Sequence, residues 1–236
     1  MGYSVKKITG IRKMIAEGMM KSIQTTAQYS ASIEIDASNI VSIRNELSQD
    51  VLKETGIKLT YTPLFIKIVS CVLLDFPILN SIVDSDTIKT FDEINMSVAV
   101  DTENGLMVPV LKNVEKKNLN EIILGINNLI EKTRTGMLNV DDVIGGTFTI
   151  TNFGMYGITN STPILNIPQV AILGIGTIAK KPVFKEGKIE VSDILYLSLT
   201  ADHRIIDGAL SAKFLKGIKD VIEDKALLKS ILTKEA

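Results

Sequence analysis

The chain has 236 residues, of which 45% are hydrophobic and 22% charged, and its formal net charge is −1. This length allows one large domain or two small ones with a substantial buried core. Lysine and arginine are interspersed with aspartate and glutamate, so the sequence offers no basic stripe for nucleic acid. No stretch reaches the roughly 18 apolar residues of a membrane span. We therefore expect neither nucleic-acid nor membrane binding.

The chain contains one cysteine, Cys71, and one histidine, His203. One residue of each type cannot build the usual zinc site, and a single cysteine cannot form a disulfide within the chain. We therefore expect no bound metal. Cys71 lies in the apolar run LFIKIVSCVLL, where packing in the core is the ordinary role of a free cysteine. This cysteine usage favours a reducing, intracellular compartment.

The first part of the chain predicts a helix, a strand and two further helices. Apolar residues recur at helical spacing over residues 8–23, which indicates an amphipathic helix. The segment YSASIEIDA (29–37) alternates polar and apolar residues, as a strand does. A helix is expected over residues 39–56, ending at a glycine C-cap. The next, over residues 62–74, starts with a proline in its first turn and is apolar nearly all round, which predicts deep burial.

The remainder of the chain predicts mostly consecutive strands and three more helices. Segments rich in β-branched residues or alternating in polarity indicate strands at 87–91, 94–102, 105–112, 145–153, 169–178 and 194–202. Amphipathic periodicity indicates helices at 119–136, 209–224 and 226–234. No linker, low-complexity tract or internal repeat divides the chain. The sequence therefore predicts a single mixed α/β domain over residues 1–236.

The single histidine stands in the segment LTADHRIIDGAL (199–210), just past the end of a predicted strand. A histidine in this place can serve as an exposed base, but a hydrogen-bonded structural histidine is the more ordinary case. Asp207 precedes a helical pattern and is followed by glycine, which is also typical of a plain helix N-cap. The spacing His-x-x-x-Asp-Gly alone therefore leaves both interpretations open.

Five segments in order give the chain a family resemblance. They are RKMIAEGMMKS (12–22), NMSVAVDTENGLMVPVL (95–111), GGTFTITNFGMYG (145–157), IPQVAILGIG (167–176) and LSLTADHRIIDGA (197–209). Over nearly its whole length the chain resembles the catalytic domain of the dihydrolipoamide acyltransferases, the cores of 2-oxo acid dehydrogenase complexes. The resemblance implies an α/β (α+β) two-layer sandwich like that of chloramphenicol acetyltransferase, with a mixed central sheet flanked by helices.

The resemblance also implies roles for individual residues. His203 is implied to be the general base, and Thr151 of the FTIT segment is implied to donate a hydrogen bond to the oxyanion. Without the resemblance, Thr151 would simply be a strand residue with good β-propensity. Asp207 occupies the second position of the histidine motif and is expected to hold the loop in shape. We expect Asp207 to pair with Arg12 as structural support of the site.

The implied substrates are coenzyme A and dihydrolipoamide, which meet from opposite ends of an elongated channel. The sequence does not identify the residues that bind the coenzyme A phosphates. The segment GIGTIA (174–179) fits a loose dinucleotide-binding pattern, but KKPVFKEGK follows it without helical periodicity, so we expect turns there. Lys225 lies in the tripeptide Asp-Lys-Ala, which carries lipoyl in lipoyl domains. Here the tripeptide separates two helical patterns, and no lipoylation is expected.

The resemblance further implies a homotrimer, in which the histidine of one chain faces the hydroxyl residue of its neighbour. Trimers are then expected to join into a hollow particle through a C-terminal helix. The apolar Leu227, Leu228, Ile231 and Leu232 suit that contact, although packing within the subunit would explain them equally. On the first interpretation, removing residues 227–236 leaves trimers and prevents larger shells.

The implied partners are the decarboxylase and dihydrolipoamide dehydrogenase components of the complex. The lipoyl and peripheral-subunit-binding domains usual in this family are absent from this sequence, so the chain is a fragment or those domains are on another polypeptide. A cytoplasmic location is expected in a prokaryote, and the mitochondrial matrix in a eukaryote.

Three functions remain open at the level of sequence. The first is acyl transfer between dihydrolipoamide and coenzyme A; the others are a chloramphenicol-type O-acetyltransferase and a non-catalytic scaffold of the same fold. Succinyl-transferring members often read DGRE after the histidine motif, whereas residues 207–210 read DGAL. This difference favours acetyl or branched-chain acyl groups.

Overall fold

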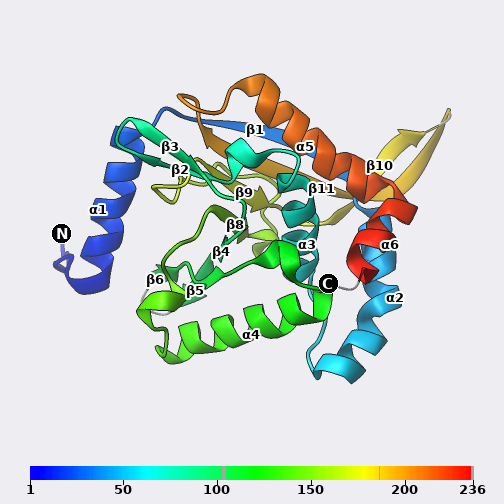
Figure 1. Cartoon of the computed structure of the whole chain (residues 1–236), viewed down its shortest axis with the longest axis horizontal. Helices are drawn as coiled ribbons and strands as arrows, with labels where there is room; N and C mark the ends of the chain where they lie inside the picture. Colours follow the sequence, from blue (N-terminus) through cyan, green and yellow to red (C-terminus); the bar gives the residue numbers. More distant parts are fainter. Residues whose placement is uncertain (103–104, 186, 235–236) are drawn as a thin grey trace.

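The structure, a computed structural model, describes residues 1–102, 105–185 and 187–234. The α-helices are α1 (Gly10–Thr25), α2 (Ser38–Thr55), α3 (Tyr61–Leu73), α4 (Leu119–Thr135), α5 (Gly208–Glu223) and α6 (Lys225–Thr233). The strands are β1 (Gln28–Asp36), β2 (Ser81–Asp84), β3 (Thr87–Thr90), β4 (Met96–Val98), β5 (Val100–Thr102), β6 (Gly105–Met107), β7 (Val110–Leu111), β8 (Phe148–Asn152), β9 (Ala171–Ile175), β10 (Ala179–Lys185) and β11 (Lys188–Asp202). Figure 1 shows their arrangement.

Within the described residues, the central sheet has seven strands in the order β1-β11-β9-β8-β4-β7, with β10 pairing β11. The pairs β4–β8 and β8–β9 are parallel, and the other pairs in this sheet are antiparallel. Two small hairpins, β2–β3 and β5–β6, stand beside it. The predicted mixed sheet is therefore confirmed.

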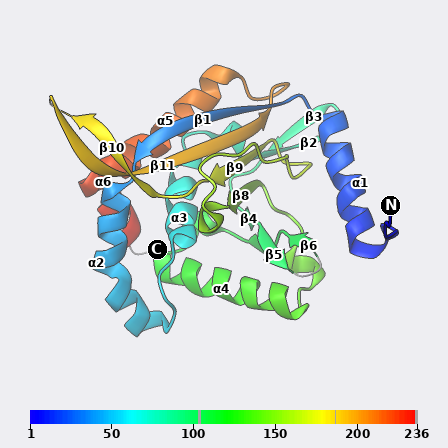
Figure 2. The ribbon, with the colours of Figure 1, turned by 180° about the vertical axis from the view of Figure 1, so that it is seen from behind.

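The helices α2 to α6 gather on one face of the sheet, as the two opposite views in Figures 1 and 2 show. The apolar helix α3 contacts α4, α5 and α6, and α5 lies against β1. Most of α3 is buried, as predicted, but Cys71 on this helix is only partly buried. Burial raises the pKa of its thiol, which keeps the sulfur protonated. The core therefore lies between one sheet face and this helical layer.

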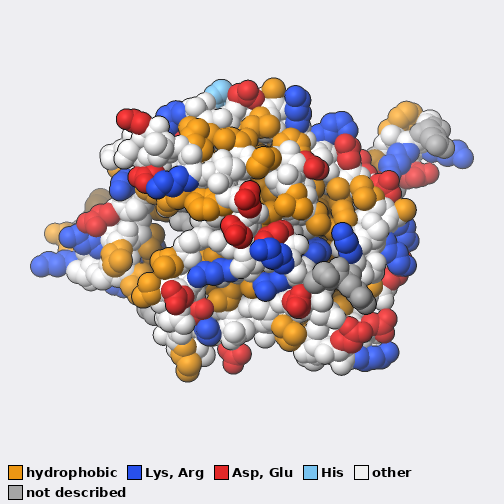
Figure 3. Space-filling view, viewed as in Figure 1, with side chains coloured by type: hydrophobic (Ala, Val, Ile, Leu, Met, Phe, Trp, Pro, Cys, Tyr) orange, Lys and Arg blue, Asp and Glu red, His pale blue; other side chains and the backbone are white. Residues whose placement is uncertain are grey.

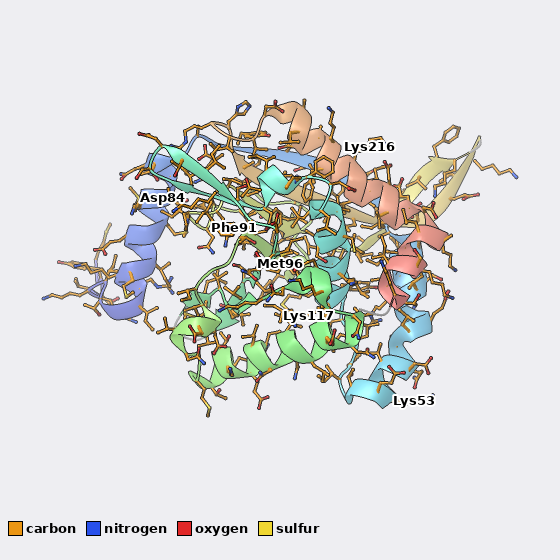
Figure 4. All side chains as sticks on the ribbon, in the orientation of Figure 1. Lys53, Asp84, Phe91, Met96, Lys117 and Lys216 are labelled. Carbon is orange, nitrogen blue, oxygen red and sulfur yellow. The ribbon has the colours of Figure 1, made fainter. Side chains whose placement is uncertain are left out.

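Side chains separate into core and surface as the pattern predicts. In Figure 4, Met96 of β4 lies in the interior, and it is fully buried. Lys53 and Lys216 project from α2 and α5, where they pair with carboxylates on their own helices. Among the described residues, no helix is long and apolar enough to cross a membrane.

Several predicted strands differ from the observed ones. Residues 94–102 form β4 and β5, because after Val98 the chain leaves the central sheet to begin a hairpin. Residues 105–112 form β6 and β7, which Val108 and Pro109 separate; proline has no N–H for a strand ladder. The strand β10 and residues 188–193 of β11 lie between the strands predicted at 169–178 and 194–202, where the sequence predicted no strand. Their many charged residues and Pro182 conceal a two-stranded ribbon.

The C-terminal helix bears on one expectation about assembly. Leu228 and Leu232 of α6 are buried within the same chain, and Ile231 packs against the core. Only Leu227 of the four apolar residues is exposed. Deleting residues 227–234 would therefore also open the core of the subunit, so this truncation does not test the contact between trimers by itself. Residues 235–236 lie outside the described part of the chain.

Candidate active site

His203 stands in the turn between the end of β11 and the start of α5. Its amide donates to the carbonyl of Ala27 at 2.9 Å, and its ring packs against the ring of Tyr29 with 4.5 Å between centroids. The residue is exposed, and Figure 3 shows the single histidine at the molecular surface. Among the described residues, neither ring nitrogen has a hydrogen-bond partner. The imidazole is therefore held on one side and free to exchange a proton on the other.

Asp202 and Arg204, on either side of His203, are joined to each other. The guanidinium of Arg204 donates to both carboxylate oxygens of Asp202, with a shortest distance of 2.5 Å. The amides of Arg204 and Ala27 also donate to this carboxylate. Burial by itself would raise the pKa of Asp202, but these hydrogen bonds outweigh burial and hold the pKa below its usual value. The pair fixes the backbone on both sides of the histidine.

Asp207 is the N-cap of α5, because its carboxylate accepts from the amide of Leu210 at 2.7 Å. The hydroxyl of Tyr29 donates to the carbonyl of Asp207 at 2.8 Å and bonds the hydroxyl of Ser211. The expected ion pair between Arg12 and Asp207 is not formed among the described residues of the chain. Arg12 instead lies beside Gly105 of β6, where it helps to cover that glycine.

Thr151 lies near the C-terminal end of β8 and lines a pocket of about 480 Å³. Its neighbours in the pocket wall come from α3, β4 to β6, α4 and the segment after β8. Apolar and polar side chains are nearly balanced, and the polar ones besides Thr151 are Thr62, Asp101, Arg134, Asn152 and Tyr156. Within the described part of the chain, the hydroxyl of Thr151 has no hydrogen-bond partner. It is therefore available to a bound molecule.

The glycines of the GIG segment let β9 pack closely against the segment 153–159, which supplies Phe153, Met155 and Tyr156 to the pocket wall. A Cβ on Gly174 would lie 2.8 Å from the ring of Phe153, and one on Gly176 would lie 2.0 Å from the carbonyl oxygen of Thr159. Only glycine lets β9 and the segment 153–159 approach so closely. Ala179 then begins a strand, so no helix N-terminus is present for a pyrophosphate.

His203 and Thr151 are far apart within one chain. The strand register aligns Thr151 with Gly174 of β9, and Gly174 with Ser198 of β11. His203 follows Ser198 by five residues, on a strand two places away. At about 3.3 Å per residue and about 4.8 Å per strand, the two residues are roughly 15–20 Å apart. One chain therefore cannot bring them to the same reacting atom.

The residues that support His203 could not be found from the sequence. Tyr29 reaches the histidine because it pairs with Ala201 across β1 and β11, a register that no local pattern reveals. Asp202 and Arg204 were visible next to the histidine, but only the folded turn shows that they pair with each other. Across residues 1–102, 105–185 and 187–234, no group of three or more histidine, cysteine or acidic side chains is placed to bind a metal.

Comparison with known proteins gives a consistent family. The family model for the 2-oxoacid dehydrogenases acyltransferase (catalytic domain) matches residues 2–229. The acetyltransferase component of the Bacillus subtilis pyruvate dehydrogenase complex is 41% identical over 94% of this chain. The lipoamide acyltransferase component of the branched-chain complex of the same organism is 40% identical over 92%. The human succinyltransferase component of the 2-oxoglutarate complex is 40% identical over 94%. The chain spans about half the length of these relatives, 50–51%.

Solved structures agree with this match. A probable dihydrolipoamide acetyltransferase from Listeria monocytogenes superposes with a TM-score of 0.91 at 40% identity, covering 95% of this chain and 96% of that one. The Azotobacter vinelandii dihydrolipoamide acetyltransferase superposes with a TM-score of 0.92 at 30% identity, covering 96% and 94%. In that enzyme a serine, a histidine and an asparagine were investigated for their role in catalysis. The serine precedes the histidine by 52 residues, and the asparagine follows it by four.

Chloramphenicol acetyltransferase, at 16% identity and a TM-score of 0.54, shares the fold. This likeness supports the two-layer architecture with a mixed sheet. The family model and the relatives above 30% identity cover nearly all of the sequence. The chain belongs to the family of 2-oxoacid dehydrogenase acyltransferase catalytic domains.

Proposed function

We propose that the chain transfers an acyl group between dihydrolipoamide and coenzyme A, as the core of a 2-oxo acid dehydrogenase complex. One observation carries the proposal. Thr151 precedes His203 by 52 residues and Asp207 follows it by four, the same spacing as the serine, histidine and asparagine of the Azotobacter enzyme. Threonine and aspartate stand here in place of serine and asparagine. Both proposed reacting groups, the imidazole and the hydroxyl, are free of protein hydrogen bonds among the described residues.

In the proposed reaction, His203 takes the proton of the attacking thiol. A thiol of pKa about 8.5 and an imidazole of pKa about 6.5 differ by about 2 units, or roughly 2.7 kcal/mol. A positioned base can supply this amount. The thiolate attacks the thioester carbonyl, and the oxygen that becomes negative accepts a hydrogen bond from the hydroxyl of Thr151. When the intermediate collapses, His203 returns the proton to the leaving sulfur.

Asp207 contributes by position and takes no proton in this scheme. Its carboxylate caps α5, and its carbonyl accepts from Tyr29, whose ring contacts His203. The network thus ties the ring that supports the base to the start of a helix. The scheme uses neither a metal nor a lipoyl group on Lys225.

The assembly follows from the distance between the two groups. Because one chain holds His203 and Thr151 roughly 15–20 Å apart, we infer that the histidine of one subunit acts with the threonine of its neighbour in a homotrimer. Trimers then form a hollow particle that binds the decarboxylase and dihydrolipoamide dehydrogenase components. A relative at 30% identity was solved as the cubic core of the pyruvate dehydrogenase multienzyme complex, which supports such an assembly. We place the protein in the bacterial cytoplasm, or in the mitochondrial matrix of a eukaryote.

Mixed assemblies test the shared site. His203→Ala and Thr151→Ala chains, each assembled alone, should lose acetyl transfer from acetyl-CoA to dihydrolipoamide, with Thr151→Ala lowering kcat by about 10²–10³. Co-expression with different affinity tags gives mixed particles in which some interfaces carry both intact residues. In a head-to-tail ring with random mixing, roughly one interface in four is intact, so activity should return to about that fraction.

Four outcomes separate the alternatives. No recovery on mixing would place the whole site in one chain and contradict the proposed sharing. Absence of acyl transfer in the wild-type assembly would favour the scaffold interpretation, and full activity in the His203→Ala assembly would overturn the role of His203 as the base. Transfer to chloramphenicol in place of dihydrolipoamide would favour the O-acetyltransferase.

The acyl group is proposed to be acetyl or branched-chain. Relatives named for acetyl, branched-chain and succinyl transfer match at nearly equal identity, so identity does not choose among them. Support comes from Ala209 and Leu210, which stand where succinyl enzymes often have Arg and Glu. Arg204, the cation next to His203, is already paired with Asp202. Turnover with acetyl-, isobutyryl- and succinyl-CoA measures the preference directly, and faster turnover of succinyl-CoA would overturn it.

A further inference from the structure

A two-stranded ribbon extends from the central sheet. It consists of β10 and the first residues of β11, paired from Ala179–Ile194 to Lys185–Lys188. The other neighbours of β11 stop short of it, since β1 ends opposite Ile194 and β9 ends opposite Leu197. Figures 1 and 2 both show the ribbon projecting from the body of the molecule.

The two faces of the ribbon differ in polarity. The pairs Pro182–Val191 and Phe184–Ile189 lie on one face, because residues directly opposite each other share a face. Phe184 is 76% exposed, Ile189 77% and Val191 69%. The other face carries Lys185, Lys188 and Glu190 at the tip, with Val183 between them. A ribbon with both faces in contact with solvent is expected to be polar on both. The exposed apolar face therefore indicates a contact with another molecule.

The ribbon is fixed in its position. Lys185 forms an ion pair with Asp36 at the end of β1, and Lys180 pairs with Asp193 across the ribbon at 3.3 Å. The ammonium of Lys181 lies 4.7 Å from the centre of the Tyr196 ring. An isolated two-stranded hairpin is marginally stable in water, and these contacts hold it to the sheet. The apolar face is therefore presented at a defined place.

The ribbon lies at the end of the sheet that carries Thr151. The strands β8 and β9 run antiparallel to β11, so their C-terminal ends point toward the start of β11, where the ribbon is. His203 lies at the opposite end of β11. A neighbouring chain that brings its His203 to this Thr151 must approach this end of the sheet.

We propose that the apolar face of the ribbon, formed by Pro182, Phe184, Ile189 and Val191, docks on a second copy of this chain, the copy that supplies His203 to the adjacent Thr151. The inference rests on the proposed function, because the need for a second copy comes from the separation of those two residues. A stable interface buries about 800 Å² on each partner, more than four side chains supply. The ribbon is thus one part of the contact and lies at its outer edge.

The test combines Phe184→Glu with Ile189→Glu in one chain and compares it with Lys188→Glu. Both variants change the charge by −2, at the same tip but on opposite faces. Both Phe184 and Ile189 are largely exposed, so the double variant should keep the circular dichroism spectrum of the wild type. Analytical ultracentrifugation at matched micromolar concentrations should show the double variant dissociating at least tenfold more readily, and Lys188→Glu should sediment as the wild type does.

The readouts separate this inference from the proposed function. A folded double variant that sediments like the wild type overturns the docking proposal, whatever its activity. A double variant that fails to fold also contradicts it, because the ribbon face would then be needed within the chain. If the double variant dissociates while the wild type has no transferase activity, the docking stands and the proposed function fails. A wild-type protein that is monomeric would overturn both the docking proposal and the proposed active site shared between chains.

Discussion

At the scale of single residues, the turn that carries His203 is held by the start of β1 and by an ion pair within the turn itself. Ala27 accepts from its amide, Tyr29 packs on its ring, and Asp202 binds Arg204 across it. Asp202 is almost completely buried, whereas Arg204 is half exposed. Each contact positions the imidazole without bonding to either of its nitrogens. Changes at these residues should therefore alter the orientation of the base and leave its chemistry intact.

Asp202→Asn should lower stability and turnover together. The folded pKa of Asp202 lies below the unfolded value of about 3.9. Its stabilising contribution is therefore fully present above that value and is lost as the pH falls through the lower, folded pKa. Loss of a buried charged hydrogen bond costs about 1–3 kcal/mol. Urea unfolding at pH 7 should show this difference between wild type and variant, and the difference should shrink below pH 4.

The control for this prediction is Asp220→Asn. Asp220 also pairs with a cation, Lys216, but both side chains are exposed on α5, where such pairs contribute little. A difference for Asp202→Asn that persists unchanged at low pH would show that the carboxylate charge is not the cause.

At the scale of elements, strand β9 packs unusually closely against the segments on either side of it. The carbonyl of Thr159 lies where a side chain on Gly176 would be, and the same strand pairs with Thr151's strand through Gly174. Strand β9 therefore sets both the register of β8 and the path of the segment that closes the pocket. A substitution here acts on the pocket through the backbone.

Gly176→Ala should be strongly destabilising, by about 2–4 kcal/mol, because the added carbon meets backbone that cannot rotate away. The melting temperature should fall, and the KM for the acyl donor should rise. Gly18→Ala in α1 is a suitable control, since a Cβ there meets nothing within 4 Å. Alanine also favours a helix over glycine by about 0.5–1 kcal/mol. Equal melting temperatures for the two variants would refute the close-packing argument.

Most helices and core strands could be predicted from the sequence because their periodicity is local. The helix over residues 119–136 was predicted from its apolar stripe and corresponds to α4, which ends at Gly136 as a left-handed C-cap. The ribbon of β10 and β11 escaped prediction because six of its fourteen paired residues are charged and both faces meet water. Hydrophobic periodicity arises where one face of an element is buried, and a projecting hairpin buries few of its side chains.

The site was predictable only in part, for a related reason. His203 and Thr151 were identified through a family resemblance, while the register that separates them is set by pairing among β8, β9 and β11. The expected pairing of Arg12 with Asp207 is not formed within the described part of the chain, because α1 places Arg12 and Ile15 beside Gly105 of β6. Contacts between segments so distant in sequence leave no periodic signal.

At the scale of the whole molecule, α6 presents one leucine outward. Leu227 is 43% exposed, and the adjacent Leu228 is fully buried. Leu227→Glu should therefore keep the melting temperature of the isolated trimer and reduce the mass of larger particles in light scattering. Leu228→Ala should instead lower stability by about 2–5 kcal/mol. If Leu227→Glu leaves the particle mass unchanged, α6 does not join the trimers.

His203 and Thr151 lie at opposite ends of the sheet, and this placement determines how many active sites the proposed assembly can form. In the proposed trimer, each subunit gives its imidazole to one neighbour and receives one from another, so each active site requires a contact between two chains. An open row of copies always leaves one donor and one acceptor idle, whereas a closed ring uses all of them. Specific activity per chain should therefore rise abruptly when the ring closes. Dilution should dissociate the ring and abolish the activity while the subunits remain folded.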